Sequence, residues 1–108
     1  MSKPAALDTA SSGDQASGAP VMRVLEICNK KGLHARASAK FVQIVEKFDA
    51  DVKVKRGNEV VGGTSIMGLM MLAAGPGTSI TIEASGNQAA EVVDALAALV
   101  SGRFTEDE

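Results

Sequence analysis

From residue 21 onward, the apolar residues alternate between two periodicities, and this feature constrains the fold more than any other. Runs in which every second residue is apolar predict strands, whereas apolar residues spaced three or four apart predict helices. The strand-like runs are 21–28, 51–55, 59–61 and 78–83, and the helical runs are 35–48, 65–74 and 87–101. The predicted order is therefore βαββαβα. Because each element has one apolar face, we expect a two-layer α+β sandwich whose sheet is open to water on its other face.

The same periodicities predict which side chains face the core. In the strands these are Leu25, Ile27, Val52, Val54, Ile80 and Ile82; in the helices they are Ala37, Phe41, Ile44, Val45, Phe48, Leu69, Leu72, Ala73, Val92, Leu96, Leu99 and Val100. Arg56-Gly57-Asn58 is predicted to form a turn, and Gly102 to cap the last helix.

The two ends of the chain differ in composition from the part between them. Ala, Ser, Gly and Pro fill 13 of the first 20 positions, and apart from Met1 the only large apolar residue there is Leu7. We therefore predict a disordered tail over 1–20, a folded domain over 21–104 and a short acidic fringe over 105–108. No apolar segment of about 7–15 residues marks a secretory signal in the tail, which favours a cytoplasmic location.

Composition excludes several classes of function. Cys28 is the only cysteine and His34 the only histidine, so an intramolecular disulfide, a cysteine zinc cluster and a histidine-rich metal site are ruled out. The chain has three Phe and no Tyr or Trp, which disfavours base stacking and hence nucleic-acid binding. No apolar run approaches the ~18 residues of a membrane span.

Positive charge gathers in the first half of the predicted domain. Residues 21–56 contain nine Lys or Arg against four Asp or Glu, and residues 57–105 contain one against four. A basic half favours an anionic ligand or an acidic partner. Ordinary solvated surface charge is the simpler interpretation of this asymmetry when it is taken alone.

His34 falls at the start of the first predicted helix, where Ser, Thr, Asp or Asn are the usual caps. A helix N-terminus presents unpaired N–H groups and a partial positive charge, so the backbone of Ala35 and Arg36 could bind phosphate. The Arg36 guanidinium could also contact phosphate oxygens. Three interpretations remain at this point: a surface histidine without function, a non-covalent anion site, and a nucleophile that forms phosphohistidine.

The segment Gly32-Leu33-His34-Ala35-Arg36-Ala37-Ser38 resembles the active-site motif of the histidine-containing phosphocarrier (HPr) family of the bacterial phosphotransferase system. Thr64-Ser65-Ile66-Met67-Gly68-Leu69 and Gly75-Pro76-Gly77-Thr78 also fall at the family's positions, so the resemblance covers about residues 21–104. It implies an open-faced β-sandwich with a four-stranded antiparallel sheet covered on one face by three helices.

The resemblance also implies a chemistry. His34 would accept a phosphoryl group on Nδ1 from phosphorylated enzyme I, which is itself charged by phosphoenolpyruvate, and would pass it to a histidine of an enzyme IIA. Arg36 would stabilise the phosphate. The protein would be a monomeric carrier rather than an enzyme with its own turnover, without a cofactor or metal. Ala37 stands where the family commonly has proline, which alters the first turn of the helix.

Ser65 stands where some family members carry a serine that an ATP-dependent HPr kinase/phosphorylase modifies; its alternative role is to cap the short helix. We expect Ile66, Met67 and Met70, with Met71, to face outward from that helix as a partner-binding patch, although they could instead fill the core. Together with Arg36, the cations of Lys40 and Lys47 would steer acidic partners toward His34.

Three functions of different classes are compatible with these features. The first is a phosphocarrier for sugar transport. The second is a regulatory protein on the same scaffold, which binds targets in nitrogen or carbon control. The third is a small anion-binding module that forms no covalent bond, and it differs from the other two in predicting no acid-labile phosphate.

Overall fold

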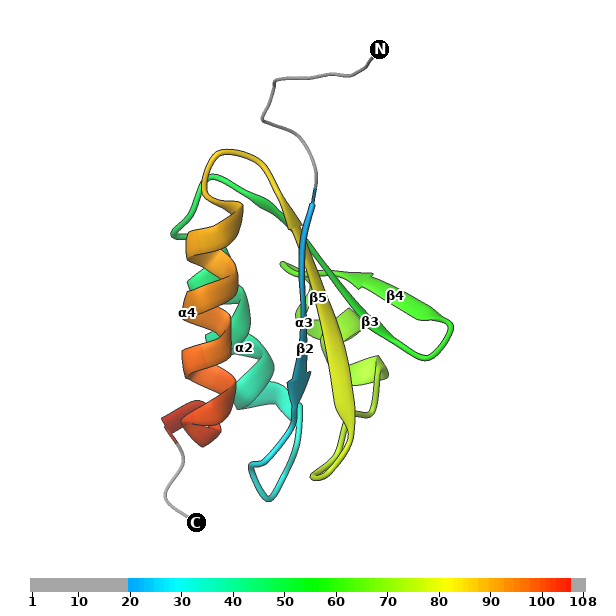
Figure 1. The fold of residues 1–108 in the computed structure, drawn as a ribbon. Coiled ribbons are helices and arrows are strands. Elements are labelled where there is room, and N and C mark those ends of the chain that lie inside the picture. Colours follow the sequence, from blue (N-terminus) through cyan, green and yellow to red (C-terminus); the bar gives the residue numbers. More distant parts are fainter. Residues whose placement is uncertain (1–19, 106–108) are drawn as a thin grey trace.

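The computed structural model describes residues 20–105, and its elements follow the predicted order (Figure 1). The strands are β2 (Val21–Glu26), β3 (Asp51–Arg56), β4 (Glu59–Gly62) and β5 (Ser79–Ser85), and the helices are α2 (Ala35–Val45), α3 (Ile66–Met71) and α4 (Ala89–Ser101). A short 3-10 helix, η1 (Arg103–Thr105), follows α4. Except for Pro20, the predicted tail lies outside the described residues, as do the last three residues of the predicted acidic fringe.

The four strands form one antiparallel sheet in the order β2-β5-β3-β4. Figure 1 shows α2 and α4 on the same side of this sheet. The buried residue of α3, Leu69, belongs to the same core as those of α2 and α4, so α3 covers that face too. On the other face Met22, Val24 and Val60 are exposed. The predicted open-faced sandwich is therefore confirmed.

Most of the predicted core is confirmed. The six strand residues predicted to face inward are at most 9% exposed, and Ala37, Phe41, Leu69, Leu72, Val92 and Leu96 are fully buried or nearly so. Ile44, Phe48 and Leu99 are only partly buried and pack against the edge of the core. Val42 and Val93 also belong to the core, although the sequence pattern did not select them.

The prediction for Ala73 is wrong, because Ala74 is buried in its place and Ala73 is exposed. Helix α3 ends at Met71 rather than at residue 74, and Ala73 adopts a left-handed conformation with φ of +54°. This conformation turns the chain, so helical spacing does not apply beyond Leu72. Arg56 was also misplaced: it is the last residue of β3 and not part of the turn.

The C-terminal end of the domain is held by a contact that the sequence did not predict. Phe104 is fully buried, and Arg103, Phe104 and Thr105 all have positive φ. The Lys40 Nζ donates to the Phe104 carbonyl oxygen and to the Thr105 Oγ1, both at 2.6 Å. Gly102 is the C-cap of α4 as predicted, with φ of −84°. The left-handed turn therefore begins one residue after it.

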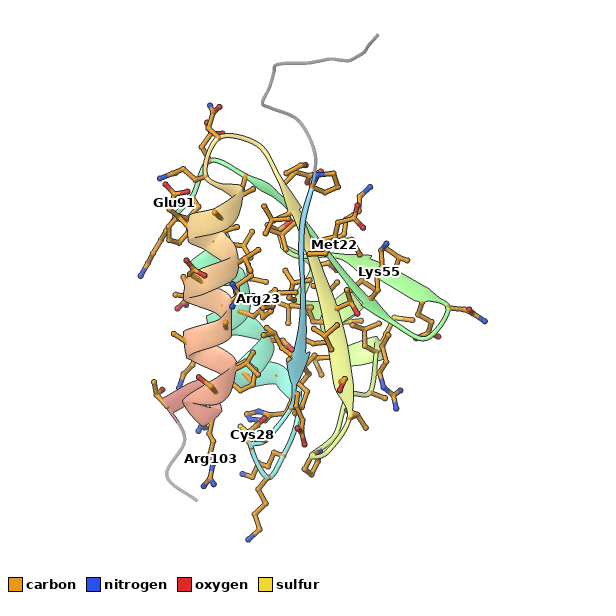
Figure 2. All side chains as sticks on the ribbon, viewed as in Figure 1. Met22, Arg23, Cys28, Lys55, Glu91 and Arg103 are labelled. Atoms are coloured by element: carbon orange, nitrogen blue, oxygen red, sulfur yellow. The ribbon has the colours of Figure 1, made fainter. Side chains whose placement is uncertain are left out.

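Cys28 lies beside the end of α4. Alternation along the first strand predicts its thiol on the face opposite Leu25 and Ile27, but β2 ends at Glu26. The Cys28 Sγ lies 3.3 Å from the carbonyl oxygen of Val100, near the end of α4. Figure 2 shows Cys28 at the same end of the molecule as Arg103, which follows α4. The thiol is exposed beside the helical layer rather than on the open face of the sheet.

Candidate functional site

His34 is the N-cap residue of α2, as the sequence predicted. Its backbone is extended, with φ of −77° and ψ of −178°, and its side chain makes no capping hydrogen bond. The helix begins where the Ser38 N–H donates to the His34 carbonyl oxygen at 2.8 Å. Of the first helical residues, Ala35 and Arg36 are exposed and Ala37 is buried. The N–H groups of a first helical turn have no intrahelical partner, and those of Ala35 and Arg36 belong to exposed residues.

The loop before His34 is packed closely against the segment after α3. Gly32 has φ of +65°, and a Cβ atom there would lie 2.3 Å from the Ala74 carbonyl oxygen. The Leu33 N–H donates to the same oxygen at 3.0 Å. The side-chain Nδ2 of the buried Asn29 donates a hydrogen bond to the Gly32 carbonyl oxygen at 2.9 Å. Only glycine satisfies both the positive φ and this close approach.

Ser38 is a buried residue of the motif that the sequence did not single out for a role. Its Oγ donates to the Leu33 carbonyl oxygen at 3.3 Å, and its side chain is fully buried. It therefore connects the first turn of α2 back to the loop and helps to fix the orientation of His34.

A pocket of about 290 Å³ lies between this loop and the end of α3. Its lining residues come from two segments about forty positions apart: Lys31, Leu33 and His34 on one side, and Met70, Ala73, Ala74 and Gly75 on the other. Polar and apolar surface contribute about equally to the wall, and His34 and Lys31 are its titratable residues. The sequence pattern did not single out Lys31, because its proximity to the α3 segment exists only in the folded chain.

Helix α3 presents the outward side chains that the sequence predicted. Ile66, Met67, Met70 and Met71 are 39, 70, 40 and 72% exposed, and we refer to these four residues as the α3 patch. Ser65 is the N-cap, and its Oγ accepts a hydrogen bond from the Gly68 N–H at 2.9 Å. The predicted capping role of Ser65 is thus confirmed. Helices α2 and α3 contact each other, and Met70 joins the α3 patch to the pocket at His34.

The predicted cations of α2 are in different situations. Arg36 is exposed beside His34, and nothing acidic lies in the first turn of α2 to repel an anion. Lys40 is half-buried and hydrogen-bonded to the C-terminal segment. Lys47 is exposed after the end of α2, about 20 Å from His34 along the helix axis at ~1.5 Å per residue. Of these three cations, Arg36 is the nearest to His34 along the chain.

Two ion pairs lie on other parts of the surface. Arg23 pairs with Asp94 at 3.0 Å, and Lys55 Nζ lies 2.6 Å from the Glu83 Oε1 on the open face of the sheet. The hydrogen bond from Lys55 and its positive charge lower the pKa of the Glu83 carboxyl below its usual value. Figure 2 shows Arg23 and Lys55 along the strands, away from the end of the molecule where Cys28 lies.

Within residues 20–105, no three or more His, Cys, Asp or Glu side chains come together in a way that could hold a metal ion. Over the same range, no helix is both long enough and apolar enough to span a bilayer.

Comparison with known proteins assigns the family. A family model described as "PTS HPr component phosphorylation site" matches residues 21–102. The phosphocarrier protein HPr of Cupriavidus necator is 49% identical over 88 residues, which cover 82% of this chain and 99% of that protein. The phosphocarrier protein NPr of Shewanella violacea is 40% identical over 84 residues, covering 78% and 92%.

Solved structures agree with this assignment. The crystal structure of HPr-C-His from Thermoanaerobacter tengcongensis has a TM-score of 0.77 at 38% identity and covers 82% of this chain and 99% of its own. A structure described as an HPr dimer from the same organism has a TM-score of 0.64 at 40% identity and covers 76% and 94%. The chain belongs to the HPr family of phosphocarrier proteins of the phosphotransferase system. The resemblance noted in the sequence is thereby confirmed.

Proposed function

We propose that this protein accepts a phosphoryl group on Nδ1 of His34 from phosphorylated enzyme I and passes it to a histidine of an enzyme IIA. One observation supports the assignment of the acceptor above all others. His34 is the only histidine of the chain, and it occupies the N-cap of α2 beside a pocket without capping the helix.

In this transfer, unprotonated Nδ1 of His34 attacks the phosphorus atom. A new N–P bond forms as the N–P bond of the donor histidine breaks, and its electron pair returns to the donor imidazole. The product carries negative charge at the positive end of the α2 dipole, where the N–H groups of Ala35 and Arg36 can donate to phosphate oxygens. The Arg36 guanidinium supplies charge-assisted hydrogen bonds. This chain thus contributes the nucleophile and the groups that stabilise its phosphorylated form.

We assign docking of both partners to the α3 patch. Its four exposed apolar side chains lie on a helix that contacts α2, and flexible methionines can adapt to unlike partner surfaces. Arg36, Lys40 and Lys47 make the adjoining surface positive, which favours acidic partners. Because Lys40 is bound to the C-terminal segment, its part is long-range attraction rather than a direct contact at His34.

Ser65 is the proposed regulatory position. The hydroxyl is on an exposed residue, as modification by an HPr kinase/phosphorylase requires, and it lies directly before Ile66 of the α3 patch. Phosphorylation adds a charge of about −1.5 to −2. An acidic partner would be repelled from the same patch, so phosphoserine 65 would slow the transfer to His34.

A regulatory role in nitrogen or carbon control is the second candidate function. The similarity to the Shewanella NPr supports this candidate. The two roles differ in the protein that receives the phosphoryl group from His34. Incubation of the phosphorylated carrier with the enzyme IIA proteins of the source organism separates them: transfer to a sugar-specific IIA supports transport. Transfer confined to a IIA without a sugar permease supports regulation.

We further propose that the carrier works as a monomer in the cytoplasm. A related structure is described as an HPr dimer from Thermoanaerobacter tengcongensis, so the oligomeric state of this chain calls for a direct measurement. Sedimentation equilibrium of the full chain should give the monomer mass of 11.1 kDa. A dimer mass at micromolar concentration would contradict this proposal.

Phosphorylation by enzyme I and phosphoenolpyruvate tests the proposed function. Wild type should gain one acid-labile, base-stable phosphate, and His34→Ala should gain none. No labelling of wild type by the enzyme I of the source organism would instead favour a non-covalent anion-binding module.

A further inference from the structure

Arg56 interrupts the apolar pattern of the buried face of the sheet. It follows Val52 and Val54 on the same face of β3, and its side chain is half-buried. Its Nη1 donates a hydrogen bond to the carbonyl oxygen of Leu72 at 3.0 Å. A charged side chain at such a position needs a partner, and the partner found here is the end of α3.

Leu72 is the C-cap residue of α3. The last carbonyl groups of a helix have no intrahelical partner and carry partial negative charge, so they favour a nearby cation. The last turn of α3 contains no basic residue. Arg56 supplies both the hydrogen-bond donor and the positive charge to the end of α3 from β3.

The segment that begins at Leu72 forms one side of the site around His34. We refer to residues 72–75 as the α3 exit. Ala73 has a φ of +54°, a conformation that costs an alanine free energy and persists only where its surroundings impose it. The Ala74 carbonyl accepts the N–H of Leu33, the residue before His34. The α3 exit is therefore held by Arg56 at one end and contacts the His34 loop at the other.

We propose that Arg56 is a positioning residue for phosphoryl transfer at His34, acting through its hydrogen bond to Leu72 and the α3 exit. Ala73, Ala74 and Gly75 form one wall of the pocket that contains His34, and Met70 of the α3 patch lies beside them. Without the Arg56 contact the exit relaxes, this wall moves and the bond from Leu33 to Ala74 weakens. The proposal rests on the proposed phosphocarrier function of His34.

The test uses the full-length chain with enzyme I and phosphoenolpyruvate, and compares Arg56→Met with Lys53→Met. Lys53 is an exposed residue of the same strand, so the control removes the same charge without touching α3. The rate constant for phosphorylation of Arg56→Met should fall about fivefold, as expected for the loss of roughly one hydrogen bond. Lys53→Met should stay within about twofold of wild type.

Amide hydrogen exchange reports the position of the α3 exit independently of transfer. The Leu33 N–H of Arg56→Met should exchange about tenfold faster than in wild type, because its acceptor, the Ala74 carbonyl, is less firmly held. The amide of Ile82 in the central strand β5 should be unchanged, which separates this local effect from general loss of stability. Arg56→Lys should recover part of both properties, since lysine also donates a hydrogen bond.

Several results would overturn the proposal. One is a wild-type rate of phosphoryl transfer in Arg56→Met. Another is slow transfer in Arg56→Met while its Leu33 amide exchanges at the wild-type rate. The third is that Lys53→Met slows transfer as much as Arg56→Met does. If Arg56→Met fails to fold, Arg56→Lys is the test, and wild-type values of both transfer and Leu33 exchange would refute the role. If wild type accepts no phosphate, the proposed function fails, whereas Leu33 exchange still shows whether Arg56 fixes the α3 exit.

Discussion

Helices α2 and α3 contact each other but begin in different ways. At the start of α3, Ser65 accepts a hydrogen bond from the Gly68 N–H, as an N-cap side chain ordinarily does. At the start of α2, His34 occupies the same position with an extended backbone and makes no such bond. A good cap is worth about 1 kcal/mol of stability. Helix α2 lacks this stabilisation, because the side chain of His34 does not bond to the N–H groups of the first turn. The N–H groups of Ala35 and Arg36 are the ones that we propose bind the phosphate.

The start of α2 is therefore the place in this fold where a stabilising cap is absent at a proposed functional residue. A residue that breaks a local rule without structural compensation is typical of a functional site. Ser65 combines capping with the proposed regulation, whereas the side chain of His34 does not cap α2 and is proposed to carry the chemistry. Substitutions at each helix start, and one on the open face away from both, therefore separate function from stability.

The largest effect is expected from His34→Ser, which gives α2 the kind of cap that α3 already has. Phosphorylation from enzyme I should be lost completely, because the nucleophile is gone. At the same time the free energy of unfolding should rise by about 0.5–1 kcal/mol relative to His34→Ala, since serine can accept an N–H bond of the first turn. Urea unfolding and phosphate labelling measure the two effects. Equal stability of the serine and alanine variants would show that the backbone at residue 34 cannot support a cap.

Removing the guanidinium beside His34 should have the next largest effect. Arg36→Gln should slow phosphoryl transfer about 10- to 100-fold, because a hydrogen bond to a charged group contributes roughly 1.5–3 kcal/mol. Quenching the reaction with phosphorylated enzyme I at successive times gives the rate constant of phosphoryl transfer. Arg23→Gln is the matched control, since Arg23 is exposed on β2 and paired with Asp94. Equal rates in the two variants would exclude a role of Arg36 in stabilising the phosphate.

Two substitutions separate the capping role of Ser65 from its proposed regulatory role. Ser65→Ala loses the bond to Gly68 and should lower the free energy of unfolding by about 1 kcal/mol, with transfer within about twofold of wild type. Ser65→Asp retains a capping oxygen but adds negative charge beside the α3 patch, so transfer from enzyme I should slow about fivefold. Thermal unfolding and transfer rates distinguish the two. Wild-type transfer in Ser65→Asp would refute regulation through charge at this position.

The smallest effect is expected on the open face, which takes no part in either helix start. Lys55 lowers the pKa of Glu83, so the pair stabilises the fold above the pH range in which a free glutamate titrates. This contribution is lost as the pH falls through the lowered pKa. In Lys55→Met, an NMR titration should show the Glu83 midpoint moving up toward the usual glutamate value, with transfer at His34 unchanged. An unchanged midpoint would show that Lys55 is not the cause of the lowered pKa.

The sequence predicted the elements well because their apolar faces are regular. Val52 and Val54, and likewise Ile80 and Ile82, alternate strictly, and all four are buried. Helix ends were predicted less well, since the apolar spacing of α2 continues to Phe48 although the helix stops at Val45. Phe48 packs against the core from a turn. An apolar pattern indicates which residues are buried, and Phe48 is partly buried although it lies beyond the last residue of the helix.

The site was predictable only in part. The apolar pattern placed His34 and Arg36, two positions apart, at a helix start. Their proposed roles came from the resemblance to the HPr family and stay predictions. The pocket could not be predicted, because Lys31 and Ala73 meet only in the folded chain. The contact made by Arg56 could not be predicted for the same reason: its partner, the Leu72 carbonyl, is 16 residues further along the chain.

NMR of the protein labelled with ¹⁵N and phosphorylated by enzyme I tests the central claim most directly. If His34 is the acceptor and the start of α2 holds the phosphate, Nδ1 of His34 should show coupling to phosphorus. The amide protons of Ala35 and Arg36 should shift downfield, as expected for new hydrogen bonds to phosphate oxygens. Coupling at Nε2, or unchanged amides at Ala35 and Arg36, would contradict the account.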